Sequence, residues 1–404
     1  MKKLIAIFLF LALFTVGAVV VLQTPSDILY LLNWGEYIDD ELVKRFEAEN
    51  NCQVVLEVVT SSEAMYQKIT SNTTQYDVAI PGDYVVNQLE QEGWLLKADV
   101  TNPEYEYLSQ YKTIYNDDLK ELMDKYMVDS KGNSMEEYFF PYFWGAYSII
   151  YNTSNPNVEE VIEENGFGAL YDRSLYSSDV AIGMYDTSRW IVSSYLMSKG
   201  YDPNIVDYAS LSNEGDLSQE IQNDVMKALR TVNFDEFGND SLKRNVAIGS
   251  LDMCFTQLGD FFDTLYLVYD DSNFKGEVNF NCYIPKTTAA FFDSMVIPKT
   301  CQNYELANSF INFMLNPENA YENACSIGYS PTLKGVVELY KEASESGEYY
   351  YEGENENTSL LMKDFLLKYP MYLNPLYNSD DVYMLEPKST KYLTTCETIF
   401  NSLA

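Results

Sequence analysis

The chain has 404 residues, of which 47% are apolar, so it can bury a core and is long enough for two domains or one two-lobed body. Asp and Glu number 61 against 26 Lys and Arg, and the formal charge of −35 makes nucleic acid and anionic lipid surfaces poor partners for the body. The chain has no histidine, which excludes Ser-His-Asp and Cys-His catalysis and His-ligated zinc and argues against an enzyme.

The amino terminus, residues 1–25, is typical of a targeting or anchoring segment rather than of a fold. Lys2 and Lys3 precede an uncharged run from Leu4 to Leu22. At about 1.5 Å per residue this run nearly crosses the hydrocarbon core, whereas signal peptides have apolar regions of about 7–15 residues. An uncleaved anchor is favoured over a cleaved signal. The two lysines then stay inside, which places the body in the periplasm or on the outer face of the membrane.

The six cysteines are too widely spaced for a CxxC motif, so neither a zinc ribbon nor a thioredoxin-like site is expected. An even number outside the cell permits disulfides, but the sequence leaves open whether they form bridges or stay buried thiols. They are Cys52, Cys254, Cys282, Cys301, Cys325 and Cys396.

From residue 28 the pattern alternates between strands and helices. ILYLLNW (28–34) predicts a buried strand, and Asp39 or Asp40 can cap a helix that runs to about residue 50. CQVVLEVV (52–59), rich in β-branched residues, predicts the next strand. Ser61 or Ser62 can then cap a second helix.

YDVAIPG (76–82) predicts a third strand, followed by a helix that Gly93 closes. The resulting βαβαβ order predicts a parallel sheet covered by helices, and ligands of such sheets bind outside the carboxyl ends of the strands. NWGEY (33–37) and PGDY (81–84) follow two of these ends. Both segments are therefore expected to face a cleft.

Several segments, in this order along the chain, resemble the spermidine/putrescine-binding proteins of bacterial ABC importers. The resemblance implies an α/β fold of the type II periplasmic-binding-protein class, in which two lobes joined by crossing hinge strands close on a ligand. Lobe 1 is expected to comprise residues 26–141 and 291–325, and lobe 2 residues 142–290 and 326–404. The segments are NWGEY, EAMYQKI, YDVAIPGDYVVNQLEQEGWL, PYFWGAYSIIYN, FFDSMVIPKT, ANSFINFMLNPENA and IGYSPT, with PYFWGAY and FFDSMVIP as the crossings.

The resemblance also implies which residues line the ligand cleft. Asp293 matches the aspartate that holds a terminal ammonium group, and Phe255 and Phe291 fall where the family has tryptophans along the aliphatic chain. The other residues implied to face the ligand are Trp34, Glu36, Tyr37, Tyr84 and Tyr329.

The segment MYDTSRWIV departs from the family, which usually presents two acids there. Thr187 and Trp190 stand at those positions, whereas Asp186 and Arg189 are kept as neighbours. Glu386 can replace the missing acid. Asp83 and Asp260 are further candidates.

These residue types suit a polyamine, because carboxylates form charge-assisted hydrogen bonds with ammonium groups and aromatic faces attract cations and cover methylenes. The resemblance implies a receptor without enzymatic activity, cofactor or metal that delivers a polyamine to an ABC permease driven by a separate ATPase. Open alternatives are the same fold with another organic amine, a phosphorylated or carboxylated amine or ferric ion, and an anchored glycosidase with a carboxylate pair.

Overall fold

The computed structural model describes residues 27–71, 73–271, 276–353 and 358–402 of the chain. The predicted targeting or anchoring segment, residues 1–25, lies outside this part. Among the residues described, none of the helices combines the length and the apolar character that a membrane crossing needs.

The first part of the chain forms the expected βαβαβ unit. Strand β1 (Asp27–Trp34) pairs in parallel with β2 (Cys52–Val59) on one side and with β3 (Val78–Ala79) on the other. The parallel sheet predicted from the alternation of strands and helices is therefore confirmed. The helices that follow these strands are α2 (Asp40–Asn50), α3 (Ser62–Thr70) and α4 (Asp83–Gln91).

Short polar side chains fix where the first helices begin. The Asp39 carboxylate accepts hydrogen bonds from the backbone N–H groups of Glu41 (2.7 Å) and Leu42 (3.1 Å), so it caps α2. The Ser61 hydroxyl accepts one from the Ala64 N–H (3.1 Å) and caps α3. In each case the first of the two residues considered from the sequence is the cap, because a cap side chain bonds to N–H groups two or three positions further on.

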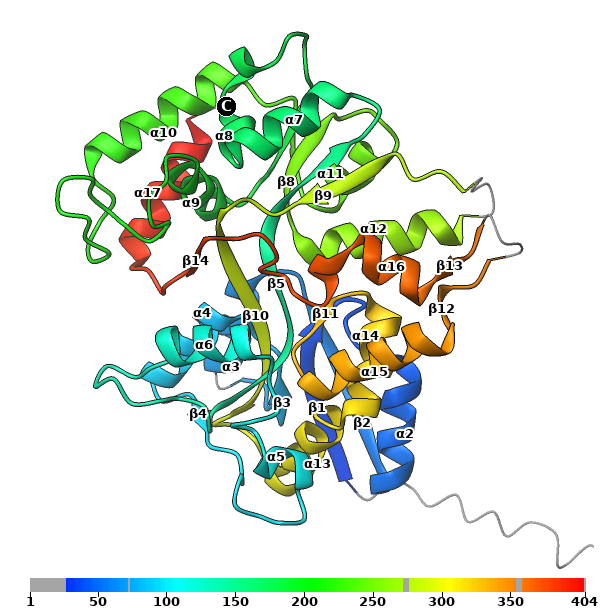
Figure 1. Cartoon of the computed structure of the whole chain (residues 1–404). Helices are drawn as coiled ribbons and strands as arrows, with labels where there is room; N and C mark the ends of the chain where they lie inside the picture. The colour runs from blue at the N-terminus through cyan, green and yellow to red at the C-terminus, as the bar shows by residue number, and fades with distance from the viewer. Residues whose placement is uncertain (1–26, 72, 272–275, 354–357, 403–404) are drawn as a thin grey trace, which may run out of the picture.

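Two long strands run through both halves of the molecule (Figure 1). Strands β5 (Phe139–Asn152) and β10 (Thr287–Pro298) pair antiparallel, and every residue of β5 is buried. They occupy the middle of a mixed sheet with the order β2-β1-β3-β10-β5-β8-β6-β7. The two predicted crossing segments, PYFWGAY and FFDSMVIP, lie in these strands.

The sheet continues beyond β5 into the second half. Strand β8 (Met253–Gln257) pairs antiparallel with β5 and in parallel with β6 (Ile182–Tyr185). Strand β7 (Glu236–Gly238) then pairs in parallel with β6, and β9 (Phe280–Tyr283) pairs with β5. The helices here are α7 (Pro156–Asn165), α8 (Gly168–Tyr171), α9 (Ser188–Ser198), α10 (Gln219–Val232), α11 (Asp240–Ala247) and α12 (Leu258–Asp270), with the 3-10 turn η1 (Arg173–Leu175).

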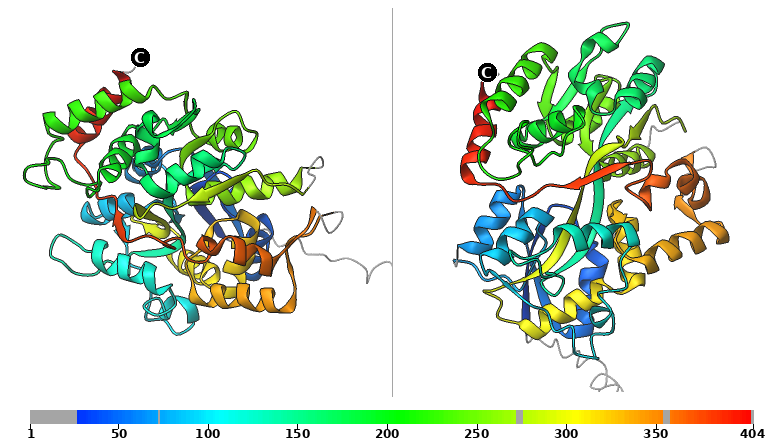
Figure 2. Two further views of the ribbon diagram at one scale, coloured as in Figure 1. Left: turned by 45° about the horizontal axis from the view of Figure 1, so that its top comes forward. Right: turned by 60° about the vertical axis from the view of Figure 1, so that its left-hand side comes forward.

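The last part of the chain makes a third connection between the halves. Strand β14 (Asp381–Met384) pairs in parallel with the start of β10, and α17 (Thr390–Asn401) then packs against α9, as Figure 2 shows. Before β14, α15 (Lys334–Ser346) packs against α14 (Pro317–Ile327), and α16 (Met362–Lys368) packs against α15. The lobe boundaries stay a prediction. That prediction assigns residues 326–404 to lobe 2, whereas these contacts favour placing residues 334–368 beside α14, most of which is assigned to lobe 1.

The remaining described elements are short or lie at the periphery. They are β4 (Leu95–Leu96), α5 (Glu106–Ser109), α6 (Asp117–Tyr126), α13 (Tyr304–Met314), β11 (Ser330–Pro331), β12 (Tyr349–Tyr351), β13 (Leu360–Leu361) and the 3-10 turn η3 (Pro370–Tyr372). All six cysteines lie among the described residues and are free thiols. Of the two possibilities that the sequence left open, disulfide bridges or thiols, the structure shows thiols.

The two adjacent aspartates before α2 give a matched test of its cap. Asp39→Ala removes two hydrogen bonds to backbone N–H groups and is expected to lower the free energy of unfolding by about 0.5–2 kcal/mol in urea denaturation. Asp40→Ala removes an exposed carboxylate and is expected to cost only a few tenths of a kcal/mol. Equal losses in the two variants would show that Asp39 does not act as the cap.

Candidate ligand-binding site

Two carboxylates meet where the β3–α4 connection touches the crossing strand β10. Gly82, which precedes Asp83 at the start of α4, forms a β-bridge with Asp293. The Asp83 carboxylate accepts a hydrogen bond from the Phe292 N–H (3.4 Å), and Asp293 accepts one from the Tyr37 hydroxyl (2.7 Å). We call Asp83 and Asp293 the acidic pair.

The alternation of β10 explains why Asp293 reaches this place. Phe291 and Asp293 are partly exposed, whereas Phe292 and Ser294 are buried, so the first two lie on one face of the strand. The pairing of β10 with β5 is irregular between Asp293 and Ser294. Such irregularities re-aim side chains beside functional sites.

Burial makes both carboxyl groups of the acidic pair weaker acids than an exposed aspartate. It raises the pKa of Asp83 to about 7 despite a hydrogen bond from the Tyr84 N–H, and repulsion by Asp293 adds to the rise. Burial likewise raises the pKa of Asp293 to about 7, although the Tyr37 hydrogen bond favours its ionised form. A cation bound here would favour the charged form of both groups.

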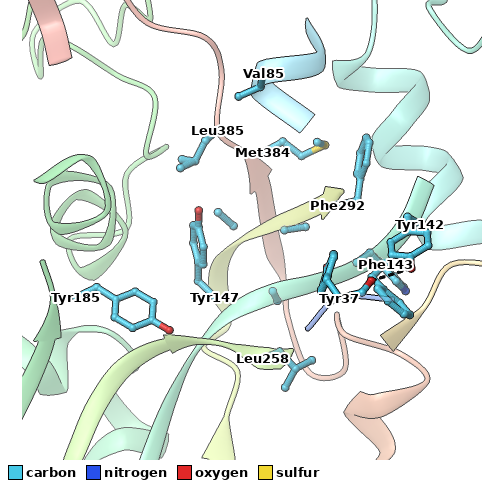
Figure 3. Packing of buried hydrophobic residues seen from close by; sticks show 14 of the residues in the cluster. Tyr37, Val85, Tyr142, Phe143, Tyr147, Tyr185, Leu258, Phe292, Met384 and Leu385 are labelled. Atoms are coloured by element: carbon cyan, nitrogen blue, oxygen red, sulfur yellow. Dashed lines mark hydrogen bonds between the residues drawn. The ribbon is translucent and has the colours of Figure 1, made fainter. Parts of the chain in front are cut away.

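Rings surround the Tyr37 side of the pair. The Tyr37 ring lies 5.1 Å from that of Tyr329 in an edge-to-face arrangement and 5.3 Å from that of Phe143, measured between ring centroids. The Tyr142 hydroxyl donates to the Tyr37 carbonyl oxygen (2.8 Å), as drawn in Figure 3. Burial raises the pKa of Tyr37 well above its usual value, so this phenol stays a neutral hydrogen-bond donor.

The Tyr329 ring packs against Gly259, a glycine in the first turn of α12. A Cβ atom added at Gly259, in the first turn of α12, would lie 2.2 Å from Cε1 of the Tyr329 ring. The ring therefore needs glycine at this position, because no real Cβ contact is that short.

The segment NWGEY forms a tight turn after β1. The Asn33 side chain accepts a hydrogen bond from the Trp34 N–H (2.8 Å) and donates to the Tyr37 carbonyl oxygen (3.5 Å). Trp34 is partly exposed, and its buried indole N–H has no hydrogen-bond partner among the described residues. Glu36 is exposed and takes a left-handed φ of 51°. The turn thus holds Tyr37 at the acidic pair and leaves Glu36 in solvent.

A second group of rings, which we call the aromatic cluster, comprises Tyr147, Tyr185, Trp190, Phe255 and Phe291. The centroid of Tyr147 lies 5.6 Å from that of Trp190, 5.4 Å from that of Phe255 and 5.9 Å from that of Phe291. Phe255 is fully buried, whereas Trp190 and Phe291 are partly exposed. Phe255 therefore supports the cluster from beneath, and Trp190 and Phe291 contribute to its surface.

The position of Phe291 also depends on a glycine. Gly145 lies opposite Phe291 on the neighbouring strand, and a Cβ atom there would lie 2.7 Å from Cζ of the ring. Two positions further along β5, Tyr147 carries its ring into the cluster. Its hydroxyl lies within electrostatic reach of both Asp83 and Asp293.

A buried arginine of α9, the helix that follows β6, contacts α4, the helix that follows β3. The Arg189 guanidinium carbon of α9 lies 4.7 Å from the centroid of the Tyr84 ring of α4, within cation–π range. The same guanidinium donates to the backbone carbonyl oxygen of Glu386. Its charge partly offsets the rise in the pKa of Asp83.

Asp186 and Glu386, two more of the predicted acids, are not members of the acidic pair. Asp186 is exposed at the end of β6. The Glu386 carboxylate accepts hydrogen bonds from the Asn213 amide (3.3 and 3.4 Å) and lies 3.8 Å from Nζ of Lys388. Glu386 also lines a cavity of about 20 Å³ together with Asp83 and Tyr84. That volume holds about one water molecule, so the two halves of the molecule are closed against each other here.

The chain matches the family model of bacterial extracellular solute-binding proteins over residues 41–348. It belongs to that family. The spermidine/putrescine-binding periplasmic protein of Salmonella typhimurium is 24% identical over 361 residues, which cover 85% of this chain and 92% of the relative. The putrescine-binding periplasmic protein PotF of Escherichia coli is 26% identical over 326 residues, covering 79% of this chain and 81% of PotF.

Solved structures give the same result. The spermidine/putrescine substrate-binding protein PotD of Streptococcus pneumoniae superimposes with a TM-score of 0.66 and 26% identity, covering 93% of this chain and 98% of PotD. The resemblance noted from the sequence and the mixed α/β periplasmic-binding-protein fold are therefore confirmed. The members of this family are solute-binding components of transporters, and they act outside the cytoplasm.

The structure brings most of the predicted site residues together. Those at or beside the acidic pair are Tyr37, Asp83, Tyr84, Asp293 and Tyr329, and those in the aromatic cluster are Phe255 and Phe291. Trp34 lies at the end of β1, before the turn that carries Tyr37. Sequence reasoning did not identify Tyr147, Gly145 or Gly259. Gly145 and Tyr147 could have been found from the sequence, because alternation along β5 places both on one face of the strand. No sequence pattern connects Gly259 to Tyr329.

The raised pKa values of the acidic pair predict how stability depends on pH. Because the folded carboxylates titrate near pH 7 and the unfolded ones near 3.8, their stabilisation is complete below about pH 4 and is lost as the pH rises through 7. Each pKa unit corresponds to about 1.4 kcal/mol, so the loss is on the order of a few kcal/mol for each carboxylate.

The double variant Asp83→Asn, Asp293→Asn isolates this contribution, because amides of similar shape do not titrate. Urea denaturation at pH 5, 6, 7 and 8 is expected to show the variant gaining stability relative to the unsubstituted protein as the pH rises. A constant difference between the two proteins across this range would contradict the raised pKa values.

Proposed function

We propose that this protein is the extracytoplasmic receptor of an ABC importer and binds a polyamine of the spermidine/putrescine type between its two halves. The observation that carries this proposal is the acidic pair, a buried and a partly exposed carboxylate flanked by tyrosine and other aromatic rings. The names of its relatives support the ligand class. A permease and a separate ATPase complete the importer, and residues 1–25 hold the receptor at the membrane.

A terminal ammonium group suits the acidic pair because each carboxylate accepts its N–H groups as charge-assisted hydrogen bonds. Such bonds contribute about 1.5–3 kcal/mol each, and a micromolar site needs about 8 kcal/mol in total. We assign the remaining binding energy to aromatic faces that cover the methylenes and attract the cation. Trp34, Trp190, Phe291 and Tyr329 are partly exposed and suit this role.

Transport requires the closed arrangement to open. The cavity beside Asp83 is too small for an alkylamine, so a ligand enters only when the halves separate. Strands β5, β10 and β14 connect the halves and are the natural hinge for this motion. Closure over the ligand then presents to the permease a shape that the open form lacks.

Calorimetric titration of the full chain with putrescine, spermidine and spermine tests the proposal. Micromolar binding is expected, with a loss of about 30-fold or more in Asp293→Asn, because one charge-assisted interaction is removed. Glu104→Gln, an exposed acid before α5, is the control and is expected to bind as well as the unsubstituted protein. Folded protein that binds none of the three amines would refute the proposal.

The acidic pair also predicts how amine affinity depends on pH. Binding an ammonium requires the pair to be ionised, whereas the unliganded carboxylates titrate near pH 7. Affinity is therefore expected to fall below pH 7 by up to about tenfold per pH unit for each carboxylate that must ionise, with proton release on binding. Titrations at pH 6, 7 and 8 in buffers of different ionisation enthalpy measure both effects. Tighter binding at pH 6 than at pH 8 would contradict the assignment.

A further inference from the structure

We infer that this site complements a single ammonium group and that its ligands are short amines whose second end needs no carboxylate partner. The second end is then an alkyl group or an alkylated nitrogen lying on the aromatic cluster. This inference rests on the proposed function and narrows its ligand class. It follows from which charges the protein itself already neutralises.

The first part of the argument is the charge at the acidic pair. Asp83 and Asp293 together carry two negative charges when both are ionised. The buried Arg189 guanidinium lies over the Tyr84 ring next to Asp83 and supplies one positive charge from the protein itself. One negative charge is left, which matches one ammonium group. A second ammonium on the Tyr84 side would meet a resident cation there.

The second part is the acid beside the aromatic cluster. Asp260, at the start of α12, accepts hydrogen bonds from the Tyr185 hydroxyl and the Thr256 hydroxyl (3.0 Å). Its other oxygen lies 3.3 Å from Nζ of Lys243, which is only 6% exposed and also pairs with Asp263 (2.7 Å). Asp260 therefore has partners within the protein for both of its oxygens and serves to hold Tyr185 in the cluster.

The third part is the surface that the second end of a ligand would meet. Trp190 packs its ring 5.2 Å from that of Tyr185 and 5.6 Å from that of Tyr147. Ring faces bind methylenes and attract cations without accepting N–H hydrogen bonds. An alkyl chain or a methylated nitrogen suits such a surface as well as a primary ammonium does.

Three ligands that differ only at one end test this inference on the full chain. They are putrescine, butylamine, and putrescine with one nitrogen trimethylated. We expect their dissociation constants to agree within about tenfold. A loss of more than tenfold for butylamine and for the trimethylated diamine would overturn the inference and point to Asp186 or Glu386 as a second acid. Absence of binding by putrescine itself would instead refute the proposed function.

A pair of variants provides a second test. Trp190→Glu places a carboxylate in the aromatic cluster, and Trp190→Gln makes a substitution of similar size without charge. The preference for putrescine over butylamine is expected to be at least tenfold greater in the glutamate variant than in the glutamine variant. Equal preferences in the two, with native-like thermal unfolding of both, would overturn the inference.

Discussion

The antiparallel pairing of β5 with β10 is the constraint on which the rest of the structure depends. These strands run through both halves, and between them they supply Tyr147, Phe291 and Asp293 to the site. Their register sets Phe291 opposite Gly145, so the aromatic ring can lie directly on the neighbouring strand. A slip by one residue would turn every side chain of β10 to the opposite face and remove both the ring and the carboxylate from the cleft.

The acidic pair shows how binding and stability oppose each other in this molecule. Burying two carboxylates next to each other is unfavourable, and the protein offsets it only in part, through Tyr37, two backbone N–H groups and Arg189. An arriving ammonium removes the remaining repulsion. The free protein thus keeps at its centre an unfavourable interaction that ligand binding relieves, which is a common property of binding and catalytic sites.

Much of this arrangement follows from local sequence. The caps Asp39 and Ser61, the parallel βαβαβ unit and the placement of NWGEY and PGDY at strand ends depend on residues close in the chain. The contacts that sequence reasoning did not reach join distant segments. Gly259 and Tyr329 are 70 positions apart, and Arg189 meets Glu386 nearly 200 positions away. No periodicity or spacing encodes such contacts, because the complete fold determines which side chains meet.

The contact of Arg189 with Tyr84 has a consequence for affinity. It joins α9 to α4, which lie in opposite halves of the molecule (Figure 1). A contact of this kind stabilises the arrangement in which the two halves touch. Only the fraction of molecules that is open then admits a ligand, and the apparent affinity is reduced by that fraction. The strength of the contact between Arg189 and Tyr84 therefore contributes to the fraction of molecules that are open.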